Sequence, residues 1–168
     1  MDLGSICVLR NHIIRLLIKL KSITTTTTIH LEQSNNKELI KSFIEEVFNK
    51  HNLEVIDKYH AAHLTNVPGK TAESFKKFLT TLFSGFPDLH VDIEHILAEN
   101  NFVIVFLNFT GTHRGEFEGM TPTNKLVKIR SADLYRIENG KIVEHWDVVD
   151  RLDVLKQTGA ITFRDHLH

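Results

Sequence analysis

The chain of 168 residues has one cysteine, three prolines and no apolar run long enough to cross a membrane. With Cys7 as its sole cysteine it forms no intramolecular disulfide, which fits a reducing compartment. The net charge is −1 and no dense basic stripe is present, so binding to nucleic acid has no electrostatic support. Without an apolar run of about 20 residues no membrane span is expected. The length indicates one domain with a substantial core.

Acidic residues are missing from positions 3–31, which contain four basic residues and a run of threonines at 24–28. This composition is typical of an organelle transit peptide. The alternatives are a disordered extension and a secretory signal peptide, whose apolar centre Arg15 and Lys19 would interrupt. We set residues 1–35 apart from the folded domain. We expect a cytoplasmic protein, or an organellar one if this segment is a transit peptide.

Apolar residues at helical spacing predict three helices in the first half of the domain. Asn35 or Asn36 can cap the first of them, and Thr71 can cap the third. The helices are expected at about 36–50, 53–59 and 71–85, with a loop at 60–69.

After Pro87 the apolar period changes to two, which predicts strands. Both alternating sets of residues 102–112 are apolar, so we expect both faces of that strand to be covered. Helices followed by antiparallel strands indicate an α+β fold in which a curved sheet wraps over the helices. The domain spans 36–161, and residues 162–168 are a tail. The strands are expected at 89–97, 102–112, 126–137 and 141–149, followed by a helical turn at 152–157.

The last predicted strand has polar residues in its middle on both alternating sets. One set contains His145 and Asp147 between Val143 and Val149. An ordinary half-buried strand has one wholly apolar face, so this pattern favours a strand that lines a ligand pocket.

The chain resembles the SnoaL-like polyketide cyclases (ester cyclases) of the nuclear transport factor 2-like superfamily over about residues 36–161. The order and spacing of four segments make the resemblance specific. They are FPDL at 86–89, TGTHRGEFEG at 110–119, TPTNK at 121–125 and RIENGKIVEHWDVVD at 136–150. Two departures, Thr121 and Asn124, fall in a loop where the family usually has PPTGK, and they bear on the identity of the substrate.

The resemblance implies a cone-shaped α+β barrel with a deep apolar cavity for a small hydrophobic molecule. It also implies ring closure of a polyketide ester by intramolecular aldol condensation, without a cofactor. By position, the family's acid/base carboxylate corresponds to Asp147. A carboxylate is a weak base in water, and an apolar surrounding increases its basicity. The plainer interpretation is that Asp147 bonds backbone amides at the end of its strand.

Asp133 is the second candidate, as a partner of His145 or as a hydrogen-bond anchor within the sheet. A two-residue Asn-Gly turn places it opposite Trp146, with Asp147 on the other face. A three-residue loop that ends in a bulge places it opposite His145. The residues leave both registers open, and the polar groups that the resemblance implies for one cavity favour the second.

Further side chains are candidates for contact with the substrate, each with a structural alternative. His63 matches a position where the family often has a pocket histidine, and His113 belongs to the TGTH segment. The other candidates are the aromatic residues Tyr59, Phe117 and Trp146.

We expect no metal site, because the eleven histidines form no tight motif such as HExxH. One alternative function is an epoxide hydrolase on the same scaffold, with Arg114 and Glu116 as a supporting pair. The other is a binding or dimerisation module without catalysis. A homodimer that pairs sheet faces is expected.

Overall fold

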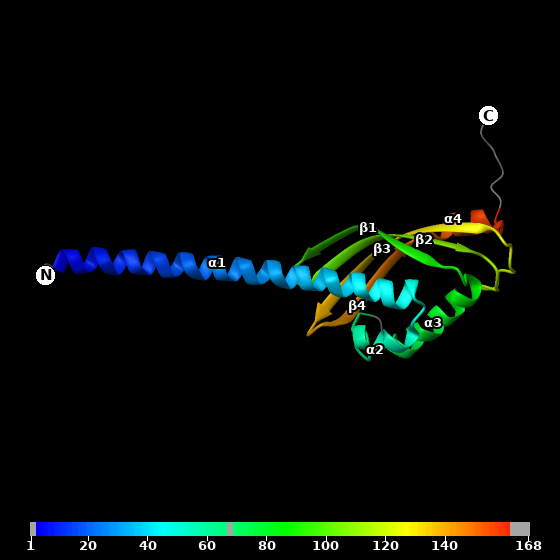
Figure 1. Ribbon diagram of the computed structural model, residues 1–168, viewed down its shortest axis with the longest axis horizontal. Coiled ribbons are helices and arrows are strands. Elements are labelled where there is room, and N and C mark those ends of the chain that lie inside the picture. The colour runs from blue at the N-terminus through cyan, green and yellow to red at the C-terminus, as the bar shows by residue number, and fades with distance from the viewer. Residues whose placement is uncertain (1–2, 67–68, 162–168) are drawn as a thin grey trace, which may run out of the picture.

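The computed structural model describes residues 3–66 and 69–161 and has an α+β architecture. Figure 1 shows a twisted, curved sheet whose concave side carries the C-terminal part of α1, together with α2 and α3. The elements before the sheet are α1 (Leu3–Phe43), the π-helical turn η1 (Ile44–Asn49), the 3-10 turn η2 (Leu53–Val55), α2 (Ile56–Tyr59) and α3 (Ala72–Gly85). The rest are β1 (His90–Glu99), β2 (Phe102–Thr112), β3 (Leu126–Glu138), β4 (Lys141–Val149) and α4 (Arg151–Thr158).

The sheet is antiparallel with strand order β1-β2-β3-β4, and it is open rather than closed into a barrel. Its inner face carries Val103, Val105 and Leu107 from β2, all at most 1% exposed. They belong to one core with Phe43 of α1 and Leu79 of α3. The predicted α+β class is therefore confirmed.

Helix α1 differs from the prediction at its start. It begins at Leu3, so Asn35 and Asn36 lie inside the helix instead of capping it. The threonines at 24–28 remain helical, each hydroxyl donating to the carbonyl oxygen four residues earlier at 2.9–3.0 Å. In Figure 1 the first part of α1 extends away from the domain as a single rod. A targeting role for residues 1–35 stays a prediction, and the tail at 162–168 lies outside the described residues.

The outer face of β2 was wrongly expected to be covered. Phe106 is 38% exposed there, and its neighbours across the sheet are also apolar. Among the described residues α1, α2 and α3 lie on the other face, and none of these helices covers the outer one.

The hairpin between β3 and β4 combines a two-residue turn with a bulge, a register that neither expected pairing anticipated. Asn139 and Gly140 both have positive φ, 51° and 71°, as a type I′ turn requires. Val143 is then an extra residue on β4, so the register shifts by one beyond the turn. Asp133 consequently lies directly opposite Asp147.

The TGTHRGEFEG segment (110–119) packs against the C-terminal end of α3 with close contact between the two backbones. The backbone N–H groups of Arg114 and Gly115 donate to the carbonyl oxygen of Gly85 at 2.9 and 3.1 Å. A Cβ atom on Gly115 would lie 2.1 Å from the carbonyl oxygen of Ser84. The motif therefore needs glycine at this position for close backbone approach.

We expect Gly115→Ala to lower the free energy of unfolding by about 2 kcal/mol or more, because backbone must move to relieve the clash. Gly119→Ala is the matched control. Gly119 has φ of +79° and open space around it, so only about 1 kcal/mol of backbone strain is expected. Urea denaturation measures both, and equal losses would contradict the clash as the cause.

Candidate functional site

A cavity of about 790 Å³ opens between the inner face of the sheet, α3, α4 and the loop that follows β2. Its walls are largely aromatic and aliphatic, with a small number of polar groups, as in small-molecule sites. The apolar walls include Phe48, Phe75, Phe78, Leu82, Phe109, Phe117, Met120, Ile129, Val149 and Val154. The polar lining residues are Lys70, Ser74, Glu118, Ser131, Asp133, His145, Asp147 and Arg151.

Asp133 and His145 form a buried pair in the wall of this cavity. They are 5% and 7% exposed, and the His145 Nε2 atom lies 3.3 Å from the Asp133 Oδ2 atom. The same oxygen accepts a hydrogen bond of 3.0 Å from the Tyr135 hydroxyl. Burial raises the pKa of the Tyr135 hydroxyl well above its usual value, and the Asp133 carboxylate adds to this effect. The tyrosine therefore stays protonated and remains a donor to Asp133.

The His145 imidazole is held by rings on two sides. It stacks on Tyr135 with centroids 4.6 Å apart and meets the edge of Phe75 at 6.3 Å. Its backbone is fixed as well, since the Asn66 side chain donates to the His145 carbonyl oxygen at 2.9 Å and accepts from its N–H at 3.3 Å. β4 is an edge strand, and at His145 the Asn66 side chain provides the hydrogen-bond partners that a neighbouring strand would otherwise provide.

Three polar atoms of the cavity wall are buried and have no hydrogen-bond partner among the described residues. They are Ser131 Oγ, Asp133 Oδ1 and His145 Nδ1. Buried polar atoms without partners are uncommon in native proteins, because each costs free energy on folding. Such a group in a cavity wall is typical of a site that completes its hydrogen bonds with a ligand.

Asp147 lies next to this pair, directly opposite Asp133 on the same face of the sheet. It lines the cavity but is exposed, whereas an apolar surrounding was expected. His145 and Val149 share its face, whereas the bulge takes Val143 out of the alternation. Water reaches the carboxylate in this structure, and an apolar ligand would have to displace it.

His60 is a buried residue beside the pair that sequence analysis missed. It stacks on Phe75 at 4.9 Å and is 3% exposed. Burial lowers the pKa of His60 to about 3, with a smaller contribution from His145. His60 is therefore neutral near pH 7. Its position within a segment without helical or strand period gave no signal of burial.

Among the aromatic candidates, Phe117 lines the cavity as expected. Tyr59 does not; it is 3% exposed and packs in the core against Phe43 at 5.6 Å. Trp146 also lies away from the cavity, since it pairs with Leu134 on the outer face of the sheet and is 41% exposed.

Neither of the two further histidine candidates lines the cavity. His113 is fully buried, with Nδ1 3.2 Å from the Thr123 hydroxyl and its ring stacked on Phe86. It therefore holds the TPTNK loop. His63 is exposed and forms an isolated bridge with Thr71 at the start of α3.

The pair proposed for an epoxide hydrolase, Arg114 and Glu116, also lies outside the cavity lining. Arg114 lies 3.5 Å from the carboxylate of Asp88 at the surface. A different pair, Arg151 and Glu118, joins α4 to the loop after β2 at the cavity wall.

In the described part of the chain, no cluster of three or more histidine, cysteine or acidic side chains is arranged for a metal ion, and no helix is long and apolar enough to cross a membrane.

The family model of SnoaL-like polyketide cyclases matches residues 38–158, which include α3, the whole sheet and α4. The chain belongs to the SnoaL-like polyketide cyclase family. The match spans every cavity-lining residue described above, so the cavity is part of the family domain. Among curated proteins no relative matches the chain.

Solved structures agree with this assignment. A candidate polyketide cyclase from Acidithiobacillus ferrooxidans is 28% identical, with a TM-score of 0.66 over 76% of this chain and 96% of that one. AclR from Streptomyces galilaeus, described as a candidate hydroxylase, is 27% identical, with a TM-score of 0.71 over 80% and 87% of the two chains. A candidate SnoaL-like cyclase from Jannaschia sp. is 23% identical with a TM-score of 0.70 over 77% and 95%, and this likeness shows the fold alone.

The low pKa of His60 predicts that the protein loses stability on acidification. Between about pH 6.5 and pH 3 the unfolded state binds a proton at His60 that the folded state excludes. The free energy of unfolding should therefore decrease as the pH is lowered through this window, by at most about 1.4 kcal/mol per pH unit from this group.

We expect His60→Phe to flatten this dependence, because the phenylalanine ring keeps the stacking without the proton. Urea denaturation at a series of pH values measures the slope. His30→Gln, at an exposed position on α1, should leave the slope close to that of the wild type. An unchanged slope in His60→Phe would contradict the assignment to His60.

Proposed function

We propose that this protein is a cofactor-free cyclase that closes a ring in a hydrophobic ester by intramolecular aldol condensation. One observation carries the proposal: Asp133, His145 and Asp147 converge in the wall of an apolar cavity of about 790 Å³. Membership of the SnoaL-like family agrees with this activity. The cavity volume suits a molecule of several fused rings, since drug-sized ligands occupy pockets of about 300–1,000 Å³.

Asp147 is the acid/base in this proposal. Its carboxylate removes a proton from a substrate carbon that lies between two carbonyl groups, and the resulting enolate carbon attacks a second carbonyl of the same molecule. A carbon–carbon bond forms, and the oxygen of the attacked carbonyl takes the proton back from Asp147. Because the substrate excludes water from Asp147 when it fills the cavity, the carboxylate becomes a stronger base there.

Asp133 and His145 stabilise the charge that develops on the substrate. The Asp133 carboxylate lies within hydrogen-bond distance of His145 Nε2 and orients the imidazole. Nδ1 of His145 is buried and has no hydrogen-bond partner among the described residues, so its N–H is available to an enolate oxygen when this nitrogen carries the proton. The rings of Tyr135 and Phe75 keep the imidazole in one orientation.

Epoxide hydrolysis is the second candidate, supported by the two carboxylates that lie opposite each other. Asp147 would activate a water molecule, and protonated Asp133 would donate to the epoxide oxygen. The cyclase is favoured because family membership agrees with it and because Asp133 Oδ2 already accepts a hydrogen bond from Tyr135 and lies 3.3 Å from His145 Nε2.

The test is turnover and thermal shift on a panel of anthraquinone-type polyketide esters, small epoxides and steroid-like ketones. A ligand that binds the folded state raises the midpoint by mass action, so the panel identifies the class that occupies the cavity. If no class of compound shifts the melting midpoint and none is turned over, a binding module is favoured instead.

For the substrate so identified, we expect Asp147→Asn to lower kcat by a factor of about 100 or more, with a small change in KM. Asp92→Asn is the matched control, because Asp92 is an exposed carboxylate on β1 outside the cavity. Full turnover in Asp147→Asn would overturn the role of Asp147.

We further propose that two copies pair through the outer face of the sheet. This face carries two apolar rows across the strands, and they leave large side chains open to solvent on a monomer. Phe106 and Val148 are 38% and 75% exposed. An exposed patch of this kind marks an interaction site. One row is Phe106, Ala132 and Val148, with His95 of β1 at its end, and next to it lie Leu97, Ile104, Leu134 and Trp146.

Phe106→Lys places a charge in the middle of this face, and we expect it to raise the dimer dissociation constant at least tenfold, since a buried unpaired ammonium is costly. Asn108→Lys adds the same charge on the same strand, two residues beyond the apolar rows, and should have little effect. Sedimentation velocity measures both. A wild-type chain that stays monomeric at high concentration would refute the pairing.

A further inference from the structure

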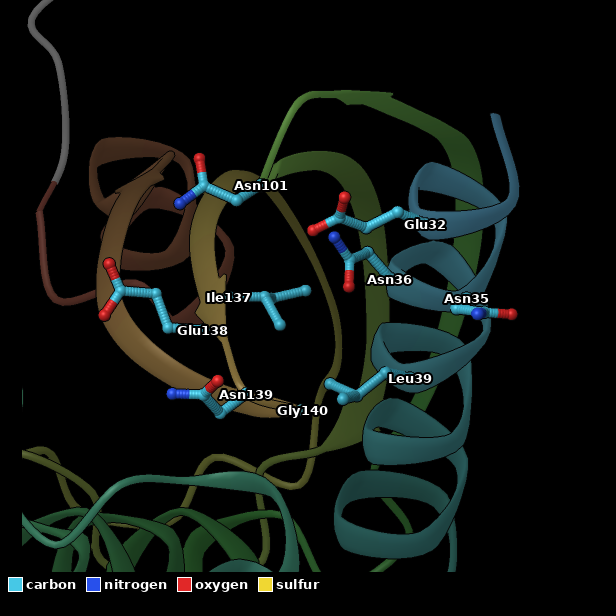
Figure 2. A pocket seen from close by; sticks show the side chains of 9 residues that line it. All are labelled: Glu32, Asn35, Asn36, Leu39, Asn101, Ile137, Glu138, Asn139 and Gly140. Carbon is cyan, nitrogen blue, oxygen red and sulfur yellow. The ribbon is translucent and has the colours of Figure 1, made fainter. Parts of the chain in front are cut away.

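We propose that a second cavity, outside the catalytic one, binds a small organic cation. It has a volume of about 630 Å³ and shares no residue with the catalytic cavity. Figure 2 shows it between α1 and the tips of the two hairpins. Its lining consists of Glu32, Asn35, Asn36, Leu39, Asn101, Ile137, Glu138, Asn139 and Gly140.

The backbone around this cavity is well defined. The N–H of Ile137 donates to the carbonyl oxygen of Asn101 at 2.8 Å and so joins the two hairpin tips. Opposite them, Glu32 and Asn36 lie four residues apart on α1 and therefore on one face of the helix. In Figure 2 both side chains point toward the hairpin tips, whereas Asn35 points away.

Asn36 is the observation that indicates a ligand. It is 8% exposed, and no hydrogen bond joins its carboxamide to another residue in the described part of the chain. Asparagine is also a poor residue for the interior of a helix. The carboxamide atoms of Asn36 are not among the fully buried polar atoms without a partner, so they lie open to the cavity, where a ligand can bond to them.

The charges of the lining select the kind of ligand. Glu138 is paired with Arg136, while Glu32 has no ion-pair partner in the described part of the chain. No lysine, arginine or histidine lines the cavity, and its other polar side chains are carboxamides. An ammonium or guanidinium group fits Glu32 and the Asn36 oxygen, since both accept hydrogen bonds.

The floor of the cavity limits the rest of the ligand. Leu39 and Ile137 face each other from α1 and β3, as Figure 2 shows, and Ile137 is 3% exposed. A short apolar body attached to the cationic group would cover these side chains. The ligand class is therefore a small amine or guanidine with one apolar group.

The full-length chain is needed for the test, because Glu32 lies before the family domain. Isothermal titration calorimetry with phenethylamine, and with 2-phenylethanol as its neutral counterpart, measures the contribution of the charge. We expect phenethylamine to bind in the millimolar range and the alcohol at least fivefold more weakly. Equal affinities, or no binding of the amine, would overturn the proposal.

Variants locate the binding. Glu32→Gln and Asn36→Leu should each weaken phenethylamine at least about fivefold. Glu38→Gln is the matched control, since Glu38 is exposed on the same helix and pairs with Lys41 at 2.8 Å. Asp147→Asn should also leave the affinity unchanged. If Asp147→Asn weakens the amine while Glu32→Gln does not, the amine binds in the catalytic cavity and the proposal is wrong.

Discussion

The bulge at Val143 is the local constraint on which the candidate site depends. It sets the register in which Asp133 faces Asp147 and Tyr135 faces His145. Without the extra residue, the same two-residue turn would put Asp133 opposite Trp146 and divide the polar groups between the two faces of the sheet. Bulges next to functional sites commonly re-aim side chains in this way.

The buried pair of Asp133 and His145 has a cost that the surrounding structure offsets. Taking polar groups out of water costs free energy unless hydrogen bonds replace those to water. Tyr135 lowers this cost by donating to Asp133 and stacking on His145. Asn66 adds bonds to the backbone at the edge of β4. These contacts hold the pair in place, while Asp147 beside it is exposed.

The two faces of the sheet serve different purposes. The inner face supplies the core at one end and the cavity at the other. The outer face is apolar without a partner in the monomer, although the doubly apolar pattern of residues 102–112 indicated a cover. A second copy would supply that cover and would also bury Trp146, which accounts for a tryptophan that neither the core nor the cavity uses.

The sequence by itself determined the α+β class, the order of the strands along the chain and the family, and it put Asp133, His145 and Asp147 forward as candidates. Periodicity and motif spacing are local properties, so they are readable without coordinates. Only the tertiary structure decided the hairpin register, the burial of His60 and the second cavity beside Asn36. Each of these depends on residues far apart in the chain. A shift of one residue in register moves every side chain of a strand to the opposite face of the sheet.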